Sequence, residues 1–266
     1  MAAATSAEPR TDPSTEPSTA PSTDTVVFFH AHPDDEAIFT GGTLVRLAAD
    51  GVRTVVVFAT NGDTDPLSPL ARARVAEAGA ACTLLGVERV VFLGYPDSGL
   101  HGDPQHPAEE VAQRLAVVLG EEHATALVVY DEGGIYGHPD HVAVHEHGVA
   151  AAAAAGVPTV YECTVDREYL HFVETHLVGH AVESLLGMEV TATNAAPLGV
   201  PTVWVTTTID VRGQAAAKRA AMAAHASQIA ADSETLTMPA DTFEGVYGFE
   251  WYIRRGPHGP LERLAF

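Results

Sequence analysis

The sequence has little cysteine and few basic residues, and each shortage excludes a class of protein. Two cysteines, Cys82 and Cys163, are too few for a disulfide framework and lack the spacing of a paired thiolate site. Lys and Arg number 14 against 35 Asp and Glu, so the formal net charge is −21 with histidine neutral. Such an acidic chain repels phosphate backbones and anionic lipid headgroups. We therefore expect neither nucleic acid nor a membrane surface as a partner.

Long hydrophobic segments are also absent. The longest lipid-like run, residues 148–157, is mostly alanine and is too short to span a bilayer. The N-terminus lacks a basic region followed by an apolar stretch, so the sequence predicts no secretory signal. These features favour a cytoplasmic protein, and they specify no oligomeric state.

Residues 1–24 differ in composition from the remainder of the chain. Pro-Ser-Thr occurs three times there, starting at Pro13, Pro17 and Pro21. A segment with so few large apolar side chains buries too little surface to offset the entropy lost on ordering, so we expect a disordered tail. The sequence then predicts a single domain over residues 25–266.

Short apolar runs alternate with amphipathic stretches in the first part of this domain. Four runs have strand length and are rich in β-branched and aromatic residues: 26–29, 55–58, 90–93 and 126–129. Ser68-Pro69 is typical of a helix start and Gly86 of a helix end, and a second helix is expected near Pro107. The order predicts an α/β fold with a Rossmann-like, mostly parallel sheet and helices on both faces.

Beyond Pro158 the alternation weakens. We expect strands at 159–161 and 203–205 and helices over 166–186 and 211–231. Aromatic residues gather between Phe243 and Tyr252, and we expect this segment to fold over the edge of the sheet. The C-terminal part, 166–266, would thus be a smaller extension of a core over 25–165.

Polar residues follow each of the first four predicted strands. In an open α/β sheet the ligand crevice lies beyond the carboxyl ends of the strands, so these segments should meet. Those after the first and fourth strands both contain His-Pro-Asp. A proline in the first helical turn and acids near the helix dipole explain part of this pattern. They do not explain His32, His138 and His141.

These residues favour a divalent metal site. Histidine and carboxylate ligands without thiolate are typical of catalytic zinc, which keeps one position open for water. His32 and Asp35 lie three residues apart, so one turn of backbone can present both to one ion, and His141 supplies a third ligand. Asp34 then lies beside the site as a candidate general base.

Other histidines around the second motif have different expected roles. His138 precedes His141 by one turn and is a candidate general acid or oxyanion stabiliser, while Asp140 is placed to orient an imidazole. His145 has the spacing of a zinc-binding helix pair, but the glutamate of such a motif is missing, so we discount it. We expect His147 at the surface.

The two motifs resemble those of the PIG-L, or LmbE-like, de-N-acetylase family. They read Ala31-His32-Pro33-Asp34-Asp35-Glu36 and Gly137-His138-Pro139-Asp140-His141. Weaker support comes from residues 94–99 and from Lys218, His225 and Ser227-Gln228, and the resemblance covers roughly residues 25 to 230. It implies a hydrolase that removes an N-acetyl or related N-acyl group from an N-acetylglucosamine-type sugar conjugate. Its expected partner is a small molecule.

The resemblance also implies roles for single residues. It makes His32, Asp35 and His141 the ligands of a zinc ion, with another divalent ion such as Fe²⁺ as an alternative, and Asp34 the base. It makes His138, partnered by Asp140, the histidine that assists the tetrahedral intermediate. Tyr136 matches a tyrosine that helps to polarise the carbonyl.

Candidates for substrate binding have alternative explanations. Asp97 and Arg74 are suited to sugar hydroxyls, but they are equally typical of a turn residue and a solvated helix charge. His225 fits either a pocket residue or a buried core histidine.

Two other functions compete with the hydrolase. A metal-dependent phosphoesterase would need more carboxylates around its ions and cations for phosphate, and the loops that follow the strands carry no Lys or Arg. A non-catalytic metal- or ligand-binding protein would need no general base, which Asp34 disfavours.

Overall fold

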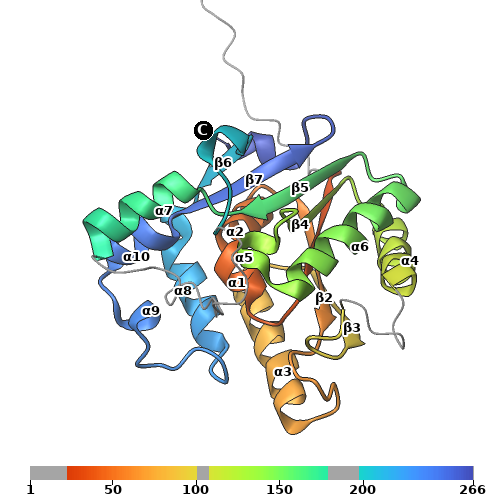
Figure 1. The fold of residues 1–266 in the computed structure, drawn as a ribbon, viewed down its shortest axis with the longest axis horizontal. Coiled ribbons are helices and arrows are strands. Elements are labelled where there is room, and N and C mark those ends of the chain that lie inside the picture. The colour runs from red at the N-terminus through yellow and green to blue at the C-terminus, as the bar shows by residue number, and fades with distance from the viewer. Residues whose placement is uncertain (1–22, 101–107, 179–197, 266) are drawn as a thin grey trace, which may run out of the picture.

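The computed structural model describes residues 23–100, 108–178 and 198–265, and these form helices on a seven-stranded sheet (Figure 1). The strand order is β3-β2-β1-β4-β5-β7-β6. The predicted tail lies almost entirely outside the described residues, as does the 179–186 part of a predicted helix. The strands are β1 (Thr25–His30), β2 (Arg53–Thr60), β3 (Arg89–Tyr95), β4 (Ala126–Tyr130), β5 (Thr159–Thr164), β6 (Thr207–Asp210) and β7 (Phe249–Arg255).

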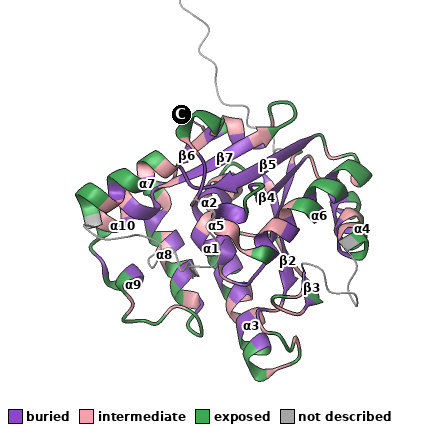
Figure 2. Ribbon diagram, viewed as in Figure 1, coloured by how far each residue is buried: buried purple, intermediate pink, exposed green. Residues whose placement is uncertain are grey.

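The first five strands are parallel, and β1, β2, β4 and β5 form the buried centre of the molecule, with β3 at the edge of the sheet. Every residue of β1, β4 and β5 is buried (Figure 2). A strand covered by helices on both faces needs apolar side chains at successive positions, which produces the continuous runs seen in the sequence. The four strand predictions before residue 130 and the one at 159–161 are therefore confirmed.

Helices cover both faces of the sheet (Figure 1). One group packs α8 against α1, α2 and α3, and the other packs α4 against α6. The predicted helix start at Ser68 is confirmed, because its Oγ accepts the N–H of Ala71 at 2.9 Å. The α-helices are α1 (Asp35–Phe39), α2 (Gly41–Ala49), α3 (Pro69–Leu84), α4 (Ala108–Glu121), α5 (Gly134–Gly137), α6 (Pro139–Ala155), α7 (Arg167–Val173), α8 (Ala215–Ala224), α9 (Glu234–Thr237) and α10 (Ala240–Tyr247).

The direction of the chain across the sheet reverses at β1. From β1 the chain proceeds to β2 and β3 on one side, then crosses back to β4 and β5 on the other. Right-handed crossovers in opposite directions place their helices on opposite faces. The loops after β1 and β4 consequently leave neighbouring strands in different directions, and such a switch point is the usual ligand site of this fold.

The C-terminal strands belong to the sheet itself, so the expected fold over its edge is wrong. Strand β7 pairs antiparallel with both β5 and β6 and lies between them. Trp251 and Tyr252 are buried in the core. The aromatic cluster forms α10 and β7 because a strand buried between two neighbours requires large apolar side chains.

Two further expectations for this region are corrected. Thr202–Trp204 forms a 3₁₀ turn and not a strand, and Val203 and Trp204 are exposed. The strand begins later, at Thr207, where backbone pairing with β7 is available. The predicted helix over 211–231 contains a 3₁₀ turn at Arg212–Gln214 and α8, and ends at Ala224. No helix in the described part of the chain is long and apolar enough to cross a membrane.

Candidate active site

The loops after β1 and β4 bring the three predicted metal ligands together. Asp35 Oδ2 lies 3.5 Å from His32 Nδ1, and Asp35 Oδ1 lies 3.5 Å from His141 Nε2. Asp35 begins α1, and His141 lies in the first turn of α6. All three side chains are buried. Residues separated by more than a hundred positions therefore meet because β1 and β4 are neighbours in the sheet.

The donor atoms of this cluster fit a divalent cation. His141 is 0% exposed, yet neither of its ring nitrogens makes a hydrogen bond. An unpaired buried polar atom is costly, and a metal ion would satisfy it. Asp35 Oδ2 accepts hydrogen bonds from the His32 N–H at 2.8 Å and the Tyr130 hydroxyl at 2.7 Å, so Oδ1 remains for a ligand.

His138 is a further candidate ligand. One ring nitrogen from each of His32, His138 and His141 lies within 4.8 Å of the others. Burial and the neighbouring His141 lower the pKa of His138 to about 4. A neutral imidazole suits either metal binding or a hydrogen bond to substrate, so the geometry leaves both roles open.

Asp140 orients an imidazole, as expected, but its carboxylate contacts His32 and not His138. Its Oδ2 lies 3.2 Å from His32 Nε2, and it also accepts the Ser98 N–H at 2.7 Å. Burial opposes protonation of His32, yet hydrogen bonds with Asp140, Asp35 and Asp97 outweigh it and raise its pKa. This carboxylate–histidine contact leaves Nδ1 facing the ligand cluster, the common outer-shell arrangement of metal-binding histidines.

Asp34 has an unusual backbone at the entrance to α1. Its φ of 125° lies in the region that favours glycine, which costs a residue with a Cβ roughly 1–3 kcal/mol. Burial and the negative charge of Asp35 raise the pKa of its carboxyl to about 7. Its backbone N–H donates to Glu36 at 3.0 Å, and its carboxylate lies 3.4 Å from Arg74.

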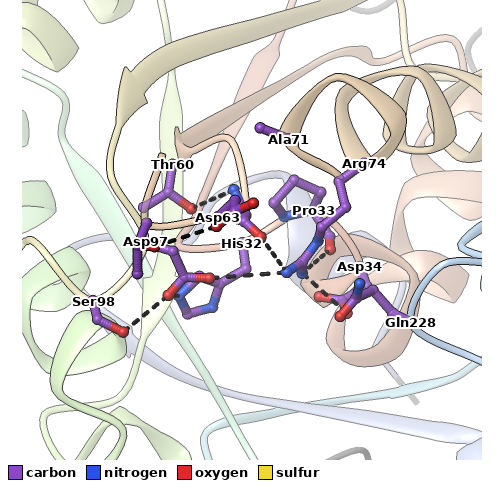
Figure 3. Close-up of polar contacts among 12 residues, drawn as sticks. His32, Pro33, Asp34, Thr60, Asp63, Ala71, Arg74, Asp97, Ser98 and Gln228 are labelled. Atoms are coloured by element: carbon purple, nitrogen blue, oxygen red, sulfur yellow. Dashed lines mark hydrogen bonds and ion pairs between the residues drawn. The ribbon is translucent and has the colours of Figure 1, made fainter. Parts of the chain in front are cut away.

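Arg74 is buried beside Asp34, so its interpretation as a solvated helix charge is wrong (Figure 3). Its guanidinium donates to the carbonyls of Gly62 at 2.7 Å and Pro33 at 2.8 Å. Asp97 Oδ2 lies 3.8 Å from it, and Asp97 Oδ1 lies 3.5 Å from His32. Arg74 thus joins the loops after β1, β2 and β3. A role for Arg74 and Asp97 in binding sugar stays a prediction.

Comparison with known proteins places the chain in a family. The family model for GlcNAc-PI de-N-acetylase, PIG-L, matches residues 27–152, a range that contains both loops. A 1D-myo-inositol 2-acetamido-2-deoxy-alpha-D-glucopyranoside deacetylase from Thermobispora bispora is 33% identical, over 88% of this chain and 89% of its own length. The chain belongs to the PIG-L family. It is an amide hydrolase of the deacetylase type.

Solved structures show the breadth of the fold that this PIG-L protein adopts. The N,N'-diacetylchitobiose deacetylase from Pyrococcus horikoshii is 20% identical, with a TM-score of 0.59 over 88% of this chain and 84% of that one. The 4-carboxy-2-hydroxymuconate hydratase from Pseudomonas putida is 16% identical, also with a TM-score of 0.59, over 90% and 98%. Because a hydratase shares the fold, the fold alone does not define the reaction.

The structure also shows where four other residues of this PIG-L chain lie. His225 is 0% exposed and bonds Glu36, which agrees with the buried core histidine, one of the two interpretations that the sequence left open. His147 is 4% exposed, which contradicts the expected surface position. His145 Nδ1 contacts the Tyr130 carbonyl at 3.0 Å. Tyr136 lies near the cluster, its ring centroid 5.3 Å from that of His141.

Tyr130 is a site residue that sequence reasoning missed. It ends β4, its hydroxyl donates to Asp35, and its ring stacks on His141 with centroids 4.0 Å apart. The same hydroxyl accepts the N–H of Ala31 at 2.9 Å. A tyrosine at the carboxyl end of a central strand, directly before a polar loop, is the signal that identifies it.

Proposed function

We propose that this PIG-L protein removes the N-acetyl group from an N-acetylglucosamine-type sugar conjugate in a zinc-dependent reaction. The supporting observation is the convergence of His32, Asp35 and His141, with both nitrogens of the buried His141 free of hydrogen bonds. We assign these three residues as the zinc ligands, with Fe²⁺ as an alternative ion. The relative named above acts on an N-acetylglucosamine linked to inositol, and we extend that substrate class to this chain.

The bound cation would supply Lewis-acid polarisation of the acetyl carbonyl and make a water molecule more acidic. Asp34 then accepts the proton of the attacking water, since its carboxyl has a pKa of about 7 and is only partly exposed. His138 and Tyr136 donate hydrogen bonds to the oxyanion that develops. Protonated Asp34 returns this proton to the departing amine. Asp140 holds His32 in its ligating orientation throughout.

The charge of the protein agrees with this reaction. A sugar conjugate that loses its acetyl group becomes a primary ammonium, and a chain of net charge −21 attracts that product. The partner is a small molecule, and we propose no role for nucleic acid or membrane. Asp97, at the rim of the site, is our candidate for binding sugar hydroxyls together with Arg74.

Arg74 is the one observation that favours a phosphoesterase, because it places a cation close to the site. The loops after the strands carry no Lys or Arg, as the sequence showed, but Arg74 reaches the site from α3. However, the guanidinium of Arg74 already bonds two carbonyls and approaches two carboxylates. Hydrolysis of a phosphate ester is accordingly an outcome that the assay below also measures.

The test uses zinc-loaded protein with an N-acetylated glucosaminyl-inositol and, separately, p-nitrophenyl phosphate. We expect release of amine and no release of phenol. Asp34→Asn should lower kcat by about 10²–10⁴-fold with zinc still bound, because the base is lost and the ligands are kept. His141→Ala should lose zinc by elemental analysis, while the control His145→Ala keeps it. Full activity in Asp34→Asn, or normal zinc in His141→Ala, would contradict the proposal.

A further inference from the structure

Glu36 lies beneath the catalytic loop in complete isolation from solvent. It follows the two aspartates of the first motif, and its side chain is 0% exposed. One carboxylate oxygen, Oε2, accepts the backbone N–H of Asp34 at 3.0 Å. The other, Oε1, lies 2.6 Å from Nε2 of His225. Glu36 therefore connects the backbone of the base to a residue from the far end of the chain.

His225 is held firmly at the end of α8. Its side chain is 0% exposed, and its carbonyl accepts the N–H groups of Gln228 at 2.9 Å and Ile229 at 2.8 Å. Helix α8 itself packs against α1, which carries Glu36, and against α3. The imidazole ring of His225 has no other hydrogen bond, since its Nδ1 is buried without a partner. The one hydrogen bond of its side chain is thus with Glu36.

Asp34 needs such a support because its backbone is strained. A φ of 125° is unfavourable for a residue with a side chain and persists only where the surroundings enforce it. The hydrogen bond to Glu36 acts directly on the peptide that takes this conformation. Losing it would let the backbone relax and move the carboxylate, and small displacements of a reacting group lower rates strongly.

We propose that Glu36 is a positioning residue for Asp34 and that His225 fixes Glu36 in that role. The proposal rests on the assignment of Asp34 as the base under the proposed function. His225 is one of the residues that support the family resemblance, and the proposal gives it a function other than contact with the substrate. Both side chains are fully buried, and their hydrogen bonds are to each other and to the Asp34 N–H; each acts through the peptide of Asp34.

Two substitutions of Glu36 test this directly. Glu36→Met and Glu36→Gln both remove the charge opposite His225 and have nearly the volume of glutamate. Only glutamine keeps an oxygen that accepts the Asp34 N–H. We expect Glu36→Met to lower kcat by about 10- to 100-fold with KM and zinc content unchanged, and Glu36→Gln to lower it by less than about threefold.

A second readout does not depend on catalysis. Hydrogen exchange at the Asp34 amide, followed by NMR, should be slow in the wild type and in Glu36→Gln, and at least about tenfold faster in Glu36→Met. If the wild type hydrolyses no acetylated sugar, the proposed function fails, while this exchange pattern still decides whether Glu36 holds Asp34. Equal losses of kcat in both variants, or unchanged exchange in Glu36→Met, would overturn the inference.

Variants of His225 complete the design. Glu36→Met/His225→Met should lose no more kcat than Glu36→Met alone, because both residues act on one peptide; additive losses would count against the proposal. This double variant also replaces Glu36→Met should the single change not fold, since it leaves no buried partner unpaired. Ser227, two residues after His225, donates two hydrogen bonds to Glu77 on α3. The control Glu77→Ala removes these bonds and should leave kcat unchanged.

Discussion

Glu250 shows how a single buried residue joins distant parts of this protein. It lies on β7, is 2% exposed, and accepts the N–H groups of Gly42 and Thr43, each at 2.8 Å. These N–H groups lie in the first turn of α2, where a helix lacks internal partners for them. Lys218 on α8 neutralises the carboxylate at 2.6 Å. The pair therefore fixes α2, α8 and β7 to one another.

Removing the cation of this pair should destabilise the protein strongly. Lys218→Met leaves the Glu250 charge buried without its ion-pair partner, and we expect a loss of about 3–5 kcal/mol in the free energy of unfolding. Urea denaturation measures it. The double variant Lys218→Met/Glu250→Gln should recover much of the loss, because the glutamine is neutral and still accepts a hydrogen bond. A Lys218→Met loss below about 1 kcal/mol would contradict this account.

At the residue scale, the sequence predicted the ligand cluster better than its surroundings. His32, Asp35 and His141 were identifiable because their chemistry is distinctive and because parallel strands bring their loops to one edge. The burial of Arg74 was not predictable, and the burial of His225 was one of two interpretations that the sequence left open. The partners of each include residues more than forty positions away, and no local pattern marks a polar side chain whose charge is balanced by tertiary contacts.

At the scale of elements, the final 3₁₀ turn, Pro260–Arg263, is tied to three strands by Glu262. Its carboxylate accepts hydrogen bonds from Tyr161 on β5 and, at 3.0 Å, from Thr207 on β6, and it pairs with Arg254 on β7. Burial opposes ionisation of Glu262, yet the hydrogen bonds from Tyr161, the Gly259 N–H and Thr207 outweigh it and lower its pKa.

The lowered pKa predicts a pH-dependent effect of Glu262→Gln. A carboxyl whose folded pKa is depressed stabilises the protein above its unfolded pKa, near 4.5, and loses that contribution as the pH falls through the folded pKa. We expect the variant to lose about 1–2 kcal/mol at pH 7, with the difference from wild type shrinking below pH 4.5. Unfolding by urea across pH measures this.

Asp232→Asn provides the control, because Asp232 is exposed in a loop. Its stability should differ from wild type by less than about 0.5 kcal/mol at every pH. If the difference in free energy of unfolding between wild type and Glu262→Gln grew as the pH fell, the carboxylate would not be acting in its charged form.

The elements that the sequence predicted well are those buried on both faces. Every residue of β1, β4 and β5, and all but the first of β2, is buried, so these strands follow from continuous apolar runs. Strand β3 lies at the sheet edge and is mostly half-buried, yet its apolar run was also recognisable. Strand β6 alternates buried and half-buried residues at the sheet edge, and its signal is weaker than that of the exposed Val203 and Trp204 nearby. The sequence pattern shows which side chains are apolar, but their exposure depends on which other parts of the chain pack over them.

At the scale of the whole molecule, the C-terminal part completes the sheet and one of its covering layers. Strands β6 and β7 extend it beyond β5, and α8 packs on α1, α2 and α3. The expected division into a core over 25–165 and an extension over 166–266 thus separates elements that share one sheet.

A fragment of residues 25–165 should therefore fail to fold cooperatively. The fragment would lack β7, which pairs with β5, His225, which bonds Glu36, and α8, which packs against α3. We expect a single unfolding transition by circular dichroism for the full chain and no sharp transition for the fragment. A cooperative transition in the fragment would instead establish the first 165 residues as an independent folding unit.

The left-handed backbone of Asp34 limits how this protein can change over generations. Glycine alone adopts that conformation without penalty, and glycine carries no acid. Under selection for thermal stability alone, replacing Asp34 by glycine would be favoured, although it removes the carboxylate that we assign as the base. The carboxylate is retained only as long as turnover is selected, and a copy of the gene released from that demand would be expected to lose it early.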